Sequence, residues 1–400
     1  MKIGIITTWF ERGAAYVSKQ YQELLQENHE VFIYARGGEG YAKGDPNWDG
    51  PGVTWGKKPF LQTNLSPIRK ADLVRWVHRN GIELVVFNEQ RWWPPVIWLK
   101  EMGIIVGTYV DYYTEETVPL FESFDFLLCN TARHLSAFEW HSQAHYLPWG
   151  TDVKLFRPGE KDGADLDKLV FFSSSGYSPD RKGADVLIRA FARLSAPDIK
   201  LLIHTQADLR IFFPDLGPEI DKLVKTGRLE VIQESVPAPG LYHRGDVYCY
   251  LSKLDGIGLT LAEAISCGLP AITPDQPPMS EFVKDGVNGA LVKVRRRFCR
   301  WDGYYWPQCE VEEQDLARKL QSFVDRRKEI GALKARARDH ALEHLDWSGR
   351  REQLDEIVQS AVARPLVPEL ASQVKRYEFS HSLLYPLLRA PYRMLKSFRR

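Results

Sequence analysis

The 400-residue sequence has little cysteine, no excess of either charge and no long apolar run. Its five cysteines are an odd number, thinly spread and without a C-x-x-C pair, so we expect reduced thiols and no disulfide framework. Cys299 and Cys309 lie near each other, but no further His or Cys nearby completes a ligand set, so we expect no metal. No stretch reaches the ~18 apolar residues of a membrane span, and the N-terminal apolar run is too short for a signal peptide. We therefore expect a cytoplasmic protein.

The charges nearly cancel, because 53 basic and 52 acidic residues give a net charge of +1. They are unevenly placed: residues 375–400 carry seven Lys or Arg and a single acid, which leaves the preceding chain mildly acidic. A mildly acidic body argues against nucleic acid as the main partner. The tail over 382–400 places leucines and cations on different sides, so it is a candidate contact with an anionic membrane surface. The alternative is a tail that packs on the body or is disordered.

The order of apolar runs predicts an α/β fold. Hydrophobic residues make up 44% of the chain and no short repeat is visible, so the length predicts two domains, each with its own core. We expect strands at 3–6, 29–34, 83–87, 104–110, 126–129, 169–172, 200–204, 229–232, 247–251 and 271–273, and helices over 68–80, 184–194 and 259–267. This alternation predicts two doubly wound parallel sheets. Ligands of such sheets bind at the carboxyl ends of the strands, so the active site is expected in the cleft between the two halves.

The repeat also predicts domain boundaries. We expect a first domain over 1–157, a Pro/Gly-rich charged linker over 158–168 and a second domain over 169–335. A charged helical pattern follows, and it predicts helices over 336–370 that cross back to the first domain. The remaining residues, 371–400, form the basic tail.

The most informative motif lies over 255–270. There a loop containing Gly258 leads into a helix that begins at Leu259 and ends at a glycine. The N–H groups of Leu259 and Thr260 are then at the positive end of the helix dipole, which suits a diphosphate. Glu263, one turn further, can accept hydrogen bonds from a ribose diol. The alternative is a glycine that serves the turn alone.

A second glycine turn, at Gly176, follows the predicted strand at 169–172. It leads to two adjacent cations, Arg181 and Lys182, just before a helix. A lysine at this place can neutralise negative charge that grows on a leaving diphosphate. The alternative is a solvated lysine at a helix start.

These segments resemble the family 4 glycosyltransferases of the GT-B fold. That family has an acid, seven residues, a Glu and then A-x-x-x-G-x-P, and the matching residues here are Asp255, Glu263, Ala264, Gly268 and Pro270. The segment 280–292 is similar to a further family motif. The resemblance implies two Rossmann-like domains facing each other across a cleft. It also implies transfer of a hexosyl-type sugar from a nucleotide diphosphate sugar, with retention of configuration and without metal or cofactor.

The resemblance also implies roles for individual residues. Lys182 and Arg181 contact the diphosphate, Glu263 holds the ribose, and Asp255 and Glu281 line the sugar pocket. The implied donor-binding residues are Gly13, Gly176, Arg181, Lys182, Gly258, Leu259, Thr260, Glu263 and Glu281, and the implied catalytic residues are Asp111, Lys182, Asp255 and Glu263.

Three positions depart from the family pattern. Tyr177 replaces an arginine, Asp255 is one methylene shorter than the usual Glu, and Pro277-Pro278 replace paired glycines. The departures indicate either an unusual sugar pocket or weakened activity. Two alternatives therefore stay open: a nucleotide-sugar epimerase on the same fold, and a catalytically silent GT-B partner subunit.

The acceptor is expected to bind the first domain. Asp111 stands where the family commonly has a His, so it is a candidate for orienting an acceptor hydroxyl, or alternatively a strand-end cap. Arg91, Trp92 and Trp93 are candidate acceptor contacts, because aromatic faces stack on sugar rings; the alternative is core packing. An insertion at 295–308 is a candidate wall of the donor site or contact for an anionic acceptor. At family level, the acceptor is expected to be a saccharide or lipid-linked saccharide of bacterial surface glycan synthesis.

Overall fold

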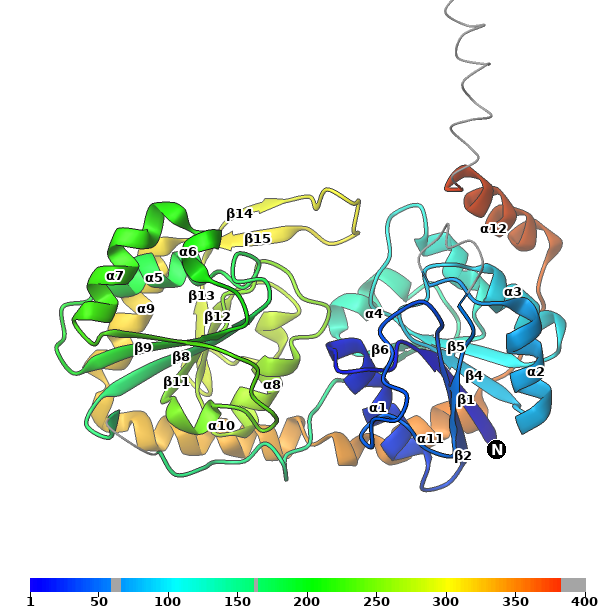
Figure 1. The fold of residues 1–400 in the computed structure, drawn as a ribbon, viewed down its shortest axis with the longest axis horizontal. Helices are drawn as coiled ribbons and strands as arrows, with labels where there is room; N and C mark the ends of the chain where they lie inside the picture. Colours follow the sequence, from blue (N-terminus) through cyan, green and yellow to red (C-terminus); the bar gives the residue numbers. More distant parts are fainter. Residues whose placement is uncertain (59–65, 162–164, 383–400) are drawn as a thin grey trace, which may run out of the picture. The chain divides into compact units, whose positions relative to one another are not determined.

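A computed structural model describes residues 1–58, 66–161 and 165–382. The chain forms two compact units, of which the first comprises Met1–Pro148 and the described chain after Gly349, and the second Trp149–Gly349. Figure 1 shows a sheet flanked by helices in each unit. The residues predicted to contact a membrane lie almost entirely outside the described part of the chain.

The first unit is built on a seven-stranded parallel sheet of order β3-β2-β1-β4-β5-β6-β7. Its strands are β1 (Lys2–Thr7), β2 (Glu30–Ala35), β3 (Val53–Trp55), β4 (Leu84–Phe87), β5 (Ile105–Tyr109), β6 (Phe126–Cys129) and β7 (Ala144–Tyr146). Strand β1 lies between β2 and β4, with Ile3 opposite Val31 on one side and Leu84 on the other. The strand order reverses between β1 and β4, which places a topological switch point at their carboxyl ends.

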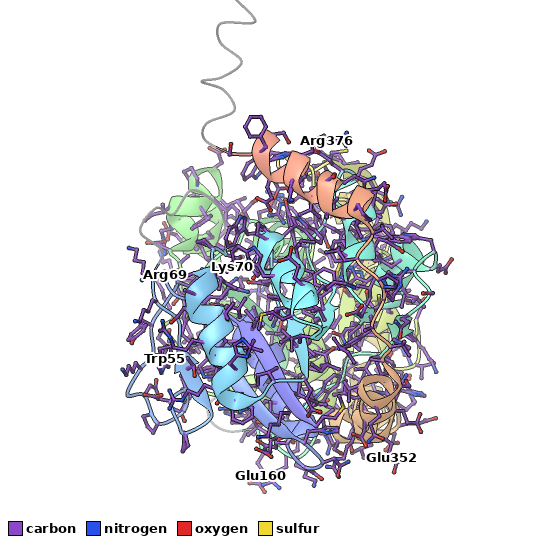
Figure 2. All side chains as sticks on the ribbon, turned by 90° about the vertical axis from the view of Figure 1, so that its right-hand side faces the viewer. Trp55, Arg69, Lys70, Glu160, Glu352 and Arg376 are labelled. Atoms are coloured by element: carbon purple, nitrogen blue, oxygen red, sulfur yellow. The ribbon has the colours of Figure 1, made fainter. Side chains whose placement is uncertain are left out.

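Helices cover the sheet of the first unit. They are α1 (Gly13–Leu25), α2 (Lys70–Asn80), α3 (Pro94–Glu101), α4 (Ala132–Phe138), α11 (Arg351–Ser360) and α12 (Pro368–Ser380), with the 3₁₀ helix η1 (Val118–Ser123). The late helix α11 is held beside the end of α1 by a hydrogen bond of 2.5 Å between His29 and Asp355. Figure 2 looks onto this unit, with Lys70 at the start of α2 and the exposed Arg376 on α12.

The second unit repeats the architecture with a six-stranded parallel sheet of order β10-β9-β8-β11-β12-β13. Its strands are β8 (Leu169–Gly176), β9 (Ile199–Thr205), β10 (Leu229–Gln233), β11 (Val247–Cys249), β12 (Ala271–Pro274) and β13 (Gly289–Val292). Its helices are α5 (Ala184–Ala192), α6 (Leu209–Phe212), α7 (Gly217–Lys225), α8 (Leu259–Ser266), α9 (Glu313–Asp325) and α10 (Ile330–His344). The insertion at 295–308 belongs to an antiparallel hairpin of β14 (Val294–Phe298) and β15 (Gln308–Val311). The predicted α/β class is confirmed.

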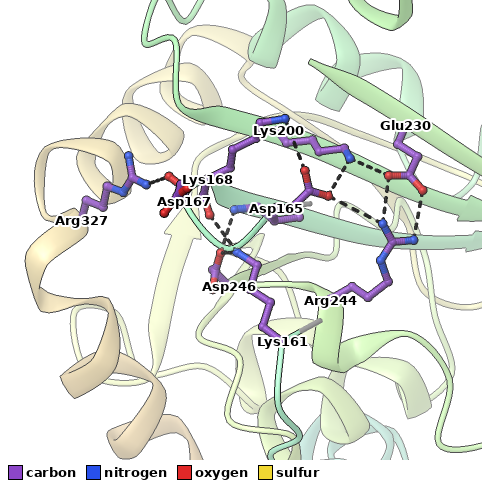
Figure 3. A network of polar contacts seen from close by, with 10 residues as sticks. Lys161, Asp165, Asp167, Lys168, Lys200, Glu230, Arg244, Asp246 and Arg327 are labelled. Carbon is purple, nitrogen blue, oxygen red and sulfur yellow. Dashed lines mark hydrogen bonds and ion pairs between the residues drawn. The ribbon is translucent and has the colours of Figure 1, made fainter. Parts of the chain in front are cut away.

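The two ends of the second sheet differ in composition. Near the amino ends of its strands, charged side chains pair with one another: Lys200 lies 2.6 Å from both Asp165 and Glu230, and Lys161 lies 2.6 Å from Asp246 (Figure 3). These pairs tie the described parts of the predicted linker to the sheet. The carboxyl ends of the strands are therefore left to carry the candidate site.

The boundary between the units lies at Pro148, before the predicted domain end at 157. The residues that follow Pro148 contact the end of the second unit. The N–H of Thr151 donates to the carbonyl of Leu345 at 2.7 Å, and the rings of Trp149 and Trp347 lie 4.6 Å apart. Tertiary contacts rather than the Pro/Gly content thus set the boundary.

Two expectations concern cysteine and the membrane. All five cysteines are free in the structure, including Cys299 and Cys309. Within 1–58, 66–161 and 165–382, no helix combines the length and the apolar character needed to cross a bilayer.

Candidate functional site

The candidate site of the second unit lies where β8 and β11 end, next to the point at which the strand order of this sheet reverses. Gly176 ends β8, and the loop after it carries Arg181 and Lys182 to the start of α5. Gly183 follows with φ +68°, and a Cβ added there would lie 2.4 Å from the carbonyl oxygen of Leu251. The glycine therefore lets the cationic loop lie directly against the end of β11.

Lys182 is held inside this site, with 13% of its side chain exposed. Its Nζ lies 2.6 Å from Oδ2 of Asp255 and donates to the hydroxyl of Tyr250 at 2.8 Å. It also lies 4.5 Å from the centre of the Tyr250 ring, within cation–π range. Burial lowers the pKa of Lys182, and the charge of Asp255 opposes that shift. Lys182 is therefore not the solvated lysine that the alternative interpretation predicts.

Asp255 accepts several hydrogen bonds at one oxygen. Its Oδ2 accepts from Lys182, from the hydroxyl of Tyr250, from Ser252 at 2.9 Å and from Arg181 at 3.3 Å. Burial alone raises the pKa of Asp255, but the charges of Lys182 and Arg181 and the hydrogen bonds outweigh burial and hold that pKa well below its usual range. The carboxylate is therefore ionised at any pH at which the protein is handled.

Helix α8 supplies the second half of the site. Gly258 precedes it with φ +105°, a conformation that favours glycine. Within the described residues, the N–H groups of Leu259 and Thr260 donate to no other group, as the first turn of a helix leaves them. These two donors and the helix dipole form a position suited to an anion.

Glu263 lies one turn into α8 and accepts a hydrogen bond of 2.6 Å from the hydroxyl of Tyr242. Burial raises the pKa of Glu263 to about 7, while the Tyr242 bond and the charge of Lys182 pull it down. The carboxyl group therefore changes its charge near neutral pH. The influence of Lys182 also shows that this lysine and Glu263 share one electrostatic environment.

The structure joins some predicted donor residues directly and places others apart. Arg181 and Lys182 both pair with Asp255, whereas Tyr177 is 76% exposed. The role of Arg181 as the second cation stays a prediction. Glu281 ends the 3₁₀ turn η5 (Met279–Glu281), which follows β12, and its side chain is exposed.

Two tyrosines that donate hydrogen bonds to the acids of the site, Tyr242 and Tyr250, were not predicted from the sequence. A signal existed for one of them. Tyr250 directly follows the short strand β11, five positions before Asp255, and a polar aromatic residue at the carboxyl end of a buried parallel strand lies where ligands bind.

A second acidic cluster lies in the first unit, after β4 and β5. Asp111 accepts the N–H of Tyr112 at 2.6 Å, which agrees with a strand-end cap. Burial, and next the charge of Glu89, raise the pKa of Asp111 to about 7, although Arg91 and Arg36 oppose the shift. Glu89 itself has φ +51°, an uncommon conformation for a residue with a side chain. Strained residues of this kind gather at functional sites.

The predicted acceptor residues fall into different environments. Trp93 is only 4% exposed and packs against Phe121 and Phe124, so the core-packing alternative replaces its expected role in stacking on a sugar. Trp92 is half-buried with its ring edge-on to Trp98. Arg91 lies over the ring of Tyr112 at 3.8 Å, near Asp111.

Gly13, the remaining donor-binding prediction, begins α1 in the first unit. The predicted insertion carries exposed cations, but Arg295 and Arg296 both pair with Glu310, at 2.8 and 2.7 Å. Trp301 in the loop of this hairpin is 92% exposed. The contacts of the insertion at 295–308 with the donor or the acceptor stay predictions.

Metal ligands need a cluster of suitable side chains. The described part of the chain has no group of three or more His, Cys, Asp or Glu placed to hold an ion. The expectation that the reaction needs no metal stays a prediction.

Part of the chain is similar in sequence to known glycosyltransferases. Residues 159–297 match the family described as glycosyl transferases group 1, which confirms the resemblance over that segment. The D-inositol 3-phosphate glycosyltransferase 1 of Catenulispora acidiphila is 26% identical over 242 residues, which are 55% of this chain and 52% of that protein. A GDP-mannose-dependent monoacylated alpha-(1-6)-phosphatidylinositol monomannoside mannosyltransferase of Corynebacterium glutamicum is 27% identical over 282 residues, 66% of this chain and 64% of that protein. The chain thus spans about half to two thirds of these relatives.

The fold is likewise similar to solved structures. The crystal structure of Anabaena Alr3699/HepE in complex with UDP and glucose matches with a TM-score of 0.70 at 17% sequence identity, and the match covers 90% of this chain and 100% of that chain. At this identity the likeness concerns the fold alone. It confirms the predicted fold class, GT-B.

Proposed function

We propose, from the match of residues 159–297 to glycosyl transferases group 1, that the chain transfers a sugar from a nucleoside diphosphate sugar to an acceptor hydroxyl. The observation that carries this proposal is the pairing of two cations with a helix start at the carboxyl ends of β8 and β11. Arg181, Lys182 and the N–H groups at the start of α8 together offer the charge and the donors that a diphosphate needs. The relative from Anabaena was solved with UDP and glucose, which are the two parts of such a donor.

The proposed reaction is attack by an acceptor hydroxyl on the anomeric carbon. A bond forms between the acceptor oxygen and that carbon, the bond to the diphosphate breaks, and negative charge grows on the leaving group. Lys182, Arg181 and the N–H groups of Leu259 and Thr260 stabilise this charge. Glu263 accepts hydrogen bonds from the ribose, in exchange for the bond it now accepts from Tyr242.

The acceptor side of the proposal rests on Asp111. Because its pKa is raised to about 7, this carboxyl can exchange a proton near neutral pH, which suits a group that orients an acceptor hydroxyl and receives its proton. We propose Arg91 and Trp92 as further acceptor contacts.

The finer specification follows the relatives. We propose a hexosyl donor, retention of configuration, reaction without metal or cofactor, and a saccharide or lipid-linked acceptor in bacterial surface glycan synthesis. The naming of a mannosyltransferase and an inositol phosphate glycosyltransferase among the similar proteins supports the hexosyl donor. Retention and the lack of a metal rest on the family resemblance alone. Attachment of a cytoplasmic enzyme to the inner face of the membrane through its basic tail is part of the same proposal.

The test is thermal stability of the purified protein with UDP, GDP, ADP and their sugars. A ligand at about 100 times its Kd adds ~2.7 kcal/mol of stability, which gives a clear shift in Tm. We expect one base and one sugar to give the largest shift and Glu263→Ala to abolish it. Glu343→Ala is the matched control, because Glu343 is an exposed acid on α10.

Other outcomes would support the alternatives. No shift with any nucleotide would favour a silent partner subunit, and the search would turn to protein partners. Conversion of the donor sugar in the absence of any acceptor would favour an epimerase.

A further inference from the structure

Lys182, Asp255 and Tyr250 form a closed triangle of interactions. Lys182 donates to both other residues, at 2.6 Å to Asp255 and 2.8 Å to Tyr250, and the tyrosine hydroxyl donates in turn to Asp255. The lysine that the proposed function assigns to the diphosphate is therefore already occupied. Its partner is a carboxylate of the same chain.

The shortness of Asp255 explains how the triangle forms. The resemblance places a Glu at this position and gives it a contact with the transferred sugar. An Asp lacks one methylene, and its Oδ2 accepts hydrogen bonds from Lys182, Tyr250, Ser252 and Arg181. Oδ2 is therefore committed to these donors rather than to a sugar hydroxyl.

Tyr250 is fixed independently of these charges. Its N–H donates to the carbonyl of Ile272 at 2.8 Å, and its ring stacks on that of Tyr248 with an interplanar angle of 24°. Its hydroxyl is therefore presented from the rigid sheet, whereas Lys182 and Asp255 both lie on loops. A fixed donor between two loop residues is suited to set their positions.

We propose that Tyr250 positions Asp255 as the internal counter-ion of Lys182, and that the diphosphate of an incoming nucleotide sugar takes the place of Asp255 on the lysine. This inference rests on the proposed function. When the lysine turns to the diphosphate, Asp255 keeps the hydrogen bonds from Tyr250 and Ser252, which stabilise its charge. Tyr250 is thus a positioning residue, and Asp255 serves the phosphate side of the reaction rather than the sugar.

The decisive variant is Asp255→Asn, tested by calorimetric titration with a nucleoside diphosphate and with its sugar. UDP, GDP and ADP are tried on the wild type, and the tightest is used. Loss of the internal counter-ion should tighten binding of the bare diphosphate on the order of tenfold, because no ion pair has to be exchanged. A sugar contact predicts the reverse pattern: unchanged affinity for the diphosphate and weaker binding of the nucleotide sugar. That pattern overturns the inference.

Tyr250→Phe tests the positioning role and serves also where the first variant does not fold. It should weaken diphosphate binding about tenfold, the size of a hydrogen bond to a charged group. The reason is that Asp255 lacks the tyrosine donor in the bound state, in which Lys182 has also left it. In the Asp255→Asn background the same change should have little effect, since an amide carries no charge to hold. Equal effects in both backgrounds would mean that Tyr250 matters for packing alone.

The matched control is Tyr34→Phe in the first unit, where a buried tyrosine donates to Asp72 at 3.0 Å. It removes the same type of bond and should leave diphosphate binding unchanged. Failure of the inference and failure of the proposed function are distinguishable. A wild type that binds none of the nucleotides contradicts the proposed function itself, whereas binding that ignores both variants contradicts only the role of Tyr250 and Asp255.

Discussion

Two aspartates, one in each unit, illustrate what a sequence position leaves undetermined. Asp255 and Asp111 both follow a strand of a parallel sheet, and burial acts on both to raise the pKa. Yet the pKa of Asp255 lies well below its usual range, while that of Asp111 is raised to about 7. The difference comes from the neighbouring charges, because equal desolvation would shift both in one direction.

The neighbours explain the contrast in detail. Asp255 accepts bonds from Lys182 and Arg181, whereas Asp111 has the like charge of Glu89 as its second-largest influence. Arg91 and Arg36 act on Asp111 as well and lower its pKa, but Arg36 is paired with Glu39 at 2.9 Å and the raising effects prevail. One unit thus holds a carboxylate that is stabilised in its charged form, and the other holds a carboxyl that can exchange a proton near neutral pH.

The largest effect should come from removing the anion of the second unit. Asp255→Asn leaves the buried ammonium of Lys182 without its counter-ion, and breaking a buried pair in this way costs about 3–5 kcal/mol of unfolding free energy. The measurement is urea unfolding at pH 7. A loss below about 1 kcal/mol would show that solvent reaches the pair, and the two aspartates would then differ less than the structure implies.

The next largest effect should come from removing the cation of this pair, and it should appear in the catalytic rate. Lys182→Ala is expected to lower kcat by about 10²–10³, the size of losing one strong electrostatic contact with the leaving group. Lys222→Ala is the control, because that lysine on α7 is exposed. Steady-state rates with the identified donor decide the matter, and a loss under about threefold would remove Lys182 from the mechanism.

The sequence predicted the framework well, because hydrophobic periodicity reports burial. Strand β6 was predicted at its observed bounds, 126–129. Strand β8 runs past its predicted end at 172, since Ser173 and Ser175 are polar and yet buried in the ladder. The strand β3, of three residues, and the hairpin of β14 and β15 were not predicted, because short or exposed strands carry little periodic signal.

The residues of the candidate site could be predicted from the sequence, but the contacts between them could not. Lys182 and Asp255 are 73 positions apart, and their pairing depends on β8 lying beside β11, which no local pattern specifies. The resemblance assigned them to different parts of the donor. Trp93 shows the opposite failure: its sequence context suited a binding platform, and only the packing of Phe121 and Phe124 places it in the core.

The smallest effect concerns the first unit and has the opposite sign. Because the folded state raises the pKa of Asp111 from its ordinary value of 3.8 to about 7, it binds this proton more tightly than the unfolded chain. Unfolding free energy therefore falls as pH rises from about 4 to about 7. Asp111→Asn removes that contribution, so the stability of the variant relative to wild type should increase by about 2–3 kcal/mol between pH 5 and pH 8. Glu263, whose pKa is also raised to about 7, acts in the same direction in both proteins and cancels in the difference. Urea unfolding of both proteins at the two pH values gives this difference. If it is the same at pH 5 and pH 8, Asp111 is ionised at both, and the contrast with Asp255 would disappear.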